Sequence, residues 1–145
     1  MTYQIKALPY EPTAPMFALS DKELFAQGAR QWVADAPGRA PCRVSLRDAD
    51  AGERLILFHY DHLIDHTSPY RAGGPIFVRE NATQATPGIG EIPAMLTRRK
   101  LSLRIYDRRN MMLEGEVIDG QALGERLTHW FANPQAQEVH IHFAP

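Results

Sequence analysis

The densest apolar run in the chain covers residues 55–58, directly after Arg54. A short continuous run of this kind is typical of a central strand that is covered on both faces. Polar side chains follow it at once, and they are His59, Asp61, His62, His66, Tyr70 and Arg71. A second apolar run, residues 76–78, comes after a glycine pair. This pattern predicts a buried strand that delivers polar groups to the loop behind it.

Alternation of apolar and polar positions predicts further strands at residues 3–8, 30–35, 42–47 and 138–143. In the last of these, Val139, Ile141 and Phe143 face inward, whereas His140 and His142 face outward. Residues 42–47 likewise place Cys42, Val44 and Leu46 on one face.

A hairpin is predicted from residues 100–106 and 111–118. A three-residue loop that ends at Asn110, in the left-handed conformation, keeps the apolar faces together. This register places Leu101 opposite Val117 and Arg104 opposite Glu114.

Three short helices are indicated. Ser20 and Glu23 have the spacing of a capping box, and Gly28 ends that helix. Pro93 opens a helix over residues 94–98. Asp119 caps a third helix, residues 121–132, with an apolar stripe of Leu123, Leu127, Trp130 and Phe131.

These elements predict an α+β fold. We expect a single domain over residues 1–145, because this length suits one domain. The expected architecture is a mostly antiparallel sheet of about 7–8 strands with two or three short helices. The chain should finish with a β-α-β crossover.

Composition excludes several classes of protein. The net charge of −1 gives no general attraction to nucleic acid or to anionic membranes. One cysteine excludes an internal disulfide, and no apolar run approaches the length of a membrane span. The first residues lack the pattern of a signal peptide. We therefore expect a cytoplasmic protein without a membrane partner, and no motif calls for a cofactor.

Several stretches together resemble one known family. They are PMFALSDKEL, RQWVADAPGRAPCRVSLRDADAGE, SPYRAGGPIFVRE and the later LSLRIYD run with its following strand, helix and His-containing strand. In these segments the chain is similar to the bacterial domain-of-unknown-function family numbered 1203. The resemblance implies a single small bacterial domain and implies no activity. It also implies a tail with Asn, Gly and Cys beyond the last strand, whereas this chain ends at Pro145.

The main candidate site is a small-anion site at the end of the central strand. A guanidinium group matches a carboxylate or phosphate, and glycines let backbone N–H groups approach a ligand closely. The predicted ligand-binding residues are Arg43, His62, Tyr70, Arg71, Gly73 and Gly74. The residues do not decide whether such a site would bind or catalyse.

A metal site is an alternative. His140 and His142 share one strand face, and Asp61, His62 or His66 could join them from a neighbouring loop, so that His62, His140 and His142 are the candidate ligands. The competing interpretation is a solvated outer face. Cys42 lies among apolar positions, so we interpret it as a buried, unreactive thiol rather than a nucleophile.

A further alternative is a protein-interaction module without chemistry, including a homodimer. A nucleic-acid partner is disfavoured, although Tyr106 lies within a basic cluster formed by Arg98, Arg99, Lys100, Arg104, Arg108 and Arg109. The hairpin register places acidic residues beside these cations, which neutralises that face.

Overall fold

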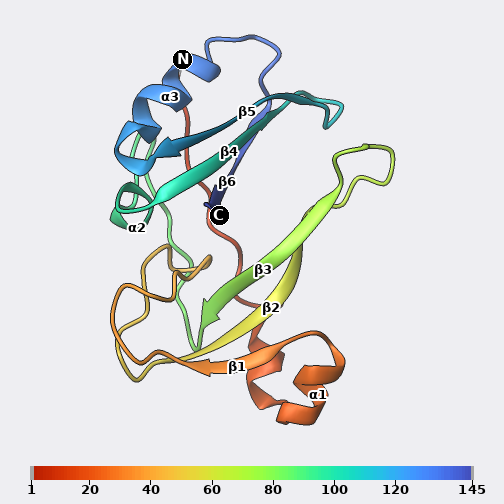
Figure 1. The fold of residues 1–145 in the computed structure, drawn as a ribbon, viewed down its shortest axis with the longest axis vertical. Helices are drawn as coiled ribbons and strands as arrows, with labels where there is room; N and C mark the ends of the chain where they lie inside the picture. The colour runs from red at the N-terminus through yellow and green to blue at the C-terminus, as the bar shows by residue number, and fades with distance from the viewer. Residues whose placement is uncertain (1, 145) are drawn as a thin grey trace. The chain divides into compact units, whose positions relative to one another are not determined.

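The computed structural model describes residues 2–144 of the chain. These residues fold into two compact units. Among the described residues, unit 1 consists of 2–5, Asp61–Ala72 and 87–144, and unit 2 consists of Lys6–Tyr60 and Gly73–Thr86. Unit 2 holds most of one three-stranded sheet, unit 1 holds the other, and each unit has short helices (Figure 1). The expected single-domain organisation stays a prediction.

The first sheet has the order β1-β2-β3, with β1 at Arg30–Val33, β2 at Arg54–Leu63 and β3 at Ala72–Arg79. The predicted central strand is confirmed, because β2 lies between its two neighbours (Figure 1). Leu55 packs with Ala34, Ala40 and Ala49, whereas Ile56 belongs to a different apolar cluster. Successive residues of a strand point to opposite faces, so this part of β2 is covered on both.

Two helical segments precede this sheet. The 3₁₀ helix η1 covers Ala14–Ala18, and the helix α1 covers Asp21–Ala26. The predicted capping box is confirmed: Ser20 Oγ accepts the Glu23 N–H, and the Glu23 carboxylate accepts the Ser20 N–H. This hydrogen bonding lowers the pKa of the Glu23 carboxyl. α1 buries Leu24, which packs with Ile56 and so ties the helix to β2.

The second sheet has the order β5-β4-β6, with β4 at Lys100–Tyr106, β5 at Met112–Asp119 and β6 at Glu138–Phe143. Asn110 in the hairpin loop has φ 57, as predicted. The predicted register is wrong along most of the hairpin, because a bulge between Ile105 and Tyr106 shifts it by one residue. Leu101 therefore lies opposite Ile118, and Arg104 lies opposite Gly115.

The predicted β-α-β crossover connects the two edges of this sheet. β5 and β6 both run antiparallel to β4, and the chain passes between them through η2 at Gly120–Ala122 and α3 at Leu123–Trp130. A short helix, α2 at Ala94–Thr97, precedes β4. Ile105 and Trp130 line one small pocket, which places α3 over the apolar face of β4.

The prediction of one sheet with 7–8 strands is wrong, because residues 2–144 contain six strands in two sheets. Residues 3–8 form no strand. Residues 42–47 form a turn, in which the Leu46 N–H bonds to the Cys42 carbonyl and Leu46 has φ 53. Their apolar side chains are buried by this chain reversal rather than by a strand.

Candidate metal centre

The segment that follows β2 is fastened to the β4–β5 loop by two side-chain hydrogen bonds. Asn110 Nδ2 donates to Asp65 Oδ2 at 2.8 Å, and the buried Ser68 Oγ donates to the Asn110 carbonyl at 2.6 Å. Thr67 also donates two hydrogen bonds to Asp65 Oδ1, one from its N–H and one from its hydroxyl. All of these residues lie in unit 1, as does His62 at the end of β2. The segment is therefore held at a fixed place against the second sheet.

These hydrogen bonds also perturb Asp65. The hydrogen bond from Asn110 is the largest cause, and those from Thr67 follow, so that the pKa of Asp65 falls from 3.8 to about 2. Hydrogen bonds to a carboxylate favour its charged form. Asp65 therefore acts as the ionised acceptor that organises the turn.

Strand β6 supplies two further histidines. His140 and His142 are two residues apart, so they share one face of the strand. In the ladder with β4, His140 pairs with Arg104 and His142 pairs with Ser102. Both histidines are half-buried, whereas Glu138 on the same face is exposed.

Three imidazoles meet where His62 reaches β6. His62 Nδ1 lies 3.1 Å from His140 Nδ1, and the ring centroids of His62 and His142 are 4.5 Å apart. One ring nitrogen from each of the three residues lies within 4.8 Å of the others. These three alone form such a group among the His, Cys, Asp and Glu side chains that the structure describes.

Two neighbours restrain His140. Its Nε2 lies 3.0 Å from Glu138 Oε1, and its ring centroid lies 4.8 Å from that of the buried Tyr106. Tyr106 also contacts Tyr70, at 6.5 Å between ring centroids. The cluster therefore has a carboxylate at one edge and an aromatic wall beside it.

Comparison with protein families gives a match over most of the chain. The family described as "Protein of unknown function (DUF1203)" matches residues 39–145, which is most of the chain and includes all three histidines. The chain belongs to the DUF1203 family. Comparison with curated proteins and with solved structures gives no match. The site of this DUF1203 chain must therefore be interpreted from its own residues.

The predicted anion-site residues are divided between the two units. His62, Tyr70 and Arg71 belong to unit 1, and Arg43, Gly73 and Gly74 belong to unit 2. Within unit 1, His62 and Tyr70 are linked through the ring contacts of His140 and Tyr106. Arg71 is exposed, and its Nη1 donates to the His66 carbonyl. This site as a whole stays a prediction.

Arg43 and the two glycines have backbone roles in unit 2. The Arg43 N–H donates to the Phe77 carbonyl, and its carbonyl accepts the Leu8 N–H. Gly73 and Gly74 lie inside β3, which begins at Ala72. The strand Ala72–Arg79 runs through both glycines, and neither of them adopts a positive φ.

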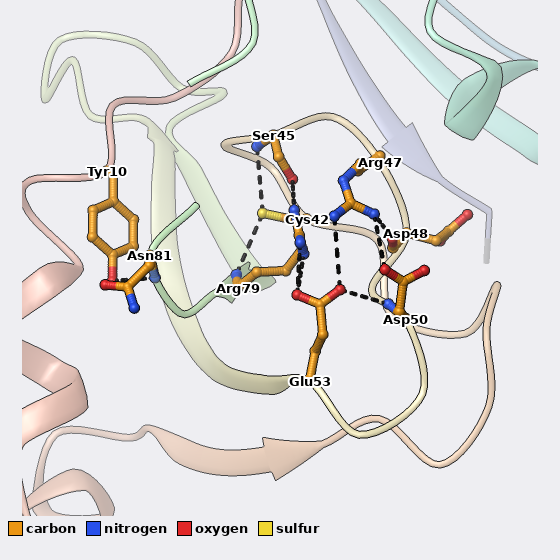
Figure 2. Close-up of polar contacts among 9 residues, drawn as sticks. All are labelled: Tyr10, Cys42, Ser45, Arg47, Asp48, Asp50, Glu53, Arg79 and Asn81. Atoms are coloured by element: carbon orange, nitrogen blue, oxygen red, sulfur yellow. Dashed lines mark hydrogen bonds and ion pairs between the residues drawn. The ribbon is translucent and has the colours of Figure 1, made fainter. Parts of the chain in front are cut away.

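Cys42 is fully buried, as predicted, and its Sγ accepts the N–H groups of Ser45 and Arg79 (Figure 2). Beside it, Arg79 Nε donates to Glu53 Oε2 at 2.8 Å, and Arg79 Nη1 donates to Ser45 Oγ. Burial alone would raise the pKa of Glu53, but its hydrogen bonds with Arg79 and with the Asp50 N–H lower it. This network joins the turn at residues 42–47 to β3 and to the start of β2.

Tyr106, the aromatic residue within the basic cluster, is buried and so does not present its ring to a base. Tyr106 is 1% exposed, and its ring lies against His140. The guanidinium carbon of Arg99 lies 5.0 Å from the centroid of the Phe143 ring, and Arg99 Nη1 donates to the Met95 carbonyl.

No helix among residues 2–144 is long and apolar enough to cross a membrane.

Sequence reasoning missed Glu138 and Tyr106 as neighbours of the histidines. The sequence did indicate Glu138, because Glu138, His140 and His142 are two residues apart in a predicted strand and therefore share one face. Tyr106 lies opposite Glu138 in the β4–β6 ladder, which follows only once that pairing is known. His59 and His66 stay outside the group, although they flank His62 in the sequence.

Proposed function

We propose that this chain binds a divalent transition metal ion through His62, His140 and His142. The convergence of the three imidazoles carries the proposal: one nitrogen from each lies within 4.8 Å of the others. They come from two strands of different sheets, yet all three lie in unit 1.

The spacing of the nitrogens fits an ion. A zinc–nitrogen bond of about 2.0–2.1 Å in tetrahedral geometry separates neighbouring ligand nitrogens by about 3.3 Å. His62 Nδ1 and His140 Nδ1 lie 3.1 Å apart, close to this separation. The third nitrogen, from His142, lies no more than 4.8 Å from the other two.

The donor set indicates the class of metal. Imidazole suits zinc, copper, iron and nickel, whereas calcium and magnesium require oxygen ligands. No carboxylate or thiol from residues 2–144 joins the three nitrogens. Zinc sites that are purely structural use four protein ligands, and three-ligand sites keep a position for water or another ligand. The donor set therefore supports an open site.

The predicted carboxylate or phosphate ligand is kept within this proposal. An ion held by three neutral imidazoles retains its positive charge and an open position, which together favour an oxygen anion. When bound, such an ion would polarise that ligand as a Lewis acid. The residues of the chain would hold and orient the ion.

The test is a titration of untagged, chelator-treated protein with Co²⁺, followed by competition with Zn²⁺. We expect saturation at one ion per chain with a visible absorption band. His62→Ala, His140→Ala and His142→Ala should each weaken binding by more than about 100-fold, the upper end for loss of an outer-shell partner. His129→Ala, a histidine on α3 outside the group, should bind as the wild type does. Absence of saturable binding, or equal losses in all four variants, would overturn the proposal.

A further inference from the structure

We infer that Glu138 is the positioning residue of this site and fixes the ring of His140 for metal binding. The inference rests on the proposed function. Glu138 and His140 share a face of β6, and Glu138 Oε1 lies 3.0 Å from His140 Nε2. The His140 side chain is 16% exposed and that of Glu138 is 52% exposed, so the contact reaches from solvent to the half-buried ring.

The chemistry of the pair determines which nitrogen carries the proton. An ionised carboxylate only accepts hydrogen bonds, and a neutral imidazole has one N–H. The contact with Glu138 therefore places the hydrogen of His140 on Nε2. Its Nδ1 is left with a lone pair, as a metal ligand requires.

The other nitrogen of His140 is aimed at the centre of the cluster. His140 Nδ1 is the atom that lies 3.1 Å from His62 Nδ1. In the metal-free chain, a hydrogen on His62 Nδ1 would be donated to this lone pair, and to bind an ion through Nδ1 the His62 ring would carry that hydrogen on Nε2 instead. The two ring nitrogens of His140 thus face two different partners, the outer carboxylate and the ion.

Tyr106 completes the support from the other side. It pairs with Glu138 in the β4–β6 ladder, and its ring centroid lies 4.8 Å from that of His140. The carboxylate restrains rotation of the imidazole at one edge, and the buried phenol ring limits tilting of its face. A ligand held in this way loses little rotational freedom when it binds an ion.

The experiment combines Co²⁺ affinity with ¹⁵N NMR of the His140 ring in the metal-free protein. The variants are Glu138→Ala and Glu138→Gln, with Glu114→Ala on β5 as the matched control. In the wild type we expect the Nε2–H tautomer of His140. Glu138→Ala should mix the tautomers and weaken Co²⁺ binding by about 10–100-fold, the usual effect of losing an outer-shell partner.

Glu138→Gln should restore most of the affinity and the tautomer, because its amide oxygen can still accept from Nε2–H. Glu114→Ala should change neither readout. Wild-type affinity and tautomer in Glu138→Ala, or a wild-type His140 protonated on both nitrogens, would overturn the inference about Glu138 alone. A wild type that binds no Co²⁺ would instead overturn the proposed function.

Discussion

The Nδ1 atoms of His62 and His140 lie 3.1 Å apart, although 78 positions separate the two residues in the chain. Residues 65–68, which follow His62, are fastened to Asn110 by hydrogen bonds. β6 is placed independently by its ladder with β4. The cluster is thus formed by a fastened segment on one side and a sheet edge on the other.

The low pKa of Asp65 makes part of the stability dependent on pH. Its pKa is about 2 in the folded chain and 3.8 ordinarily, so its contribution is present above about pH 4 and is lost as pH falls toward 2. We predict that Asp65→Asn lowers the free energy of unfolding at pH 5 and that its difference from the wild type shrinks toward pH 2. Urea unfolding at several pH values measures this. A difference that is constant across the window would contradict it.

Gly120 is predicted to be intolerant of any side chain. A Cβ there would clash with the Leu96 carbonyl oxygen and lie 2.5 Å from that of Arg99, and both are backbone atoms. Gly120→Ala should lower the free energy of unfolding by about 1–3 kcal/mol or more. Gly74→Ala is the control, because its Cβ would meet nothing within 4 Å, and it should change stability by less than about 0.5 kcal/mol. Equal thermal midpoints for the two variants would refute this.

The ion pair of Arg79 and Glu53 should stabilise unit 2. Their side chains are 12% and 23% exposed, so Glu53→Gln leaves the Arg79 charge partly desolvated without its partner. We expect a loss of about 1.5–3 kcal/mol, the range for hydrogen bonds to charged groups. Because the pKa of Glu53 is lowered, this loss should diminish as the solution becomes acidic.

The exposed pair of Arg39 and Asp35 is the control for this change. Its side chains are 72% and 74% exposed, so Asp35→Asn should have almost no effect on chemical denaturation. Similar losses of unfolding free energy in Asp35→Asn and Glu53→Gln would contradict the claim that burial makes the Arg79–Glu53 pair (Figure 2) stabilising.

The single-domain prediction can be tested with the two tryptophans. Trp32 lies in unit 2 and Trp130 lies in unit 1, so each reports on its own unit. With 5-fluorotryptophan in the wild-type sequence, ¹⁹F NMR should show both native signals disappearing at the same urea concentration. Coincident transitions are the mark of two-state unfolding. Separate midpoints would show that the two units unfold independently.

Local elements were predictable where one signal determined them. The capping box of Ser20 and Glu23 determines the start of α1, and the alternation of Val139, Ile141 and Phe143 determines β6. The same alternation failed at Cys42–Val44–Leu46, because burial in a turn produces the same spacing as burial in a strand. This turn accounts for one of the two predicted strands that the structure lacks, and residues 3–8 are the other.

The site was predictable as a set of candidates but not as a geometry. Sequence placed His140 and His142 on one face and His62 at the end of the central strand. Their meeting spans 78 positions of the chain, and the hydrogen bonds of Asn110 with Asp65 and Ser68 are long-range in the same way, so neither follows from a local sequence pattern. The bulge at Ile105 and Tyr106 likewise follows from packing, and no residue type in the hairpin demands it.

The most direct test of the metal proposal is X-ray absorption spectroscopy of the zinc-loaded, untagged protein. We predict three imidazole nitrogens at about 2.0–2.1 Å from each ion, with one fewer in His142→Ala. A first shell made only of oxygen atoms, unchanged in His142→Ala, would contradict it.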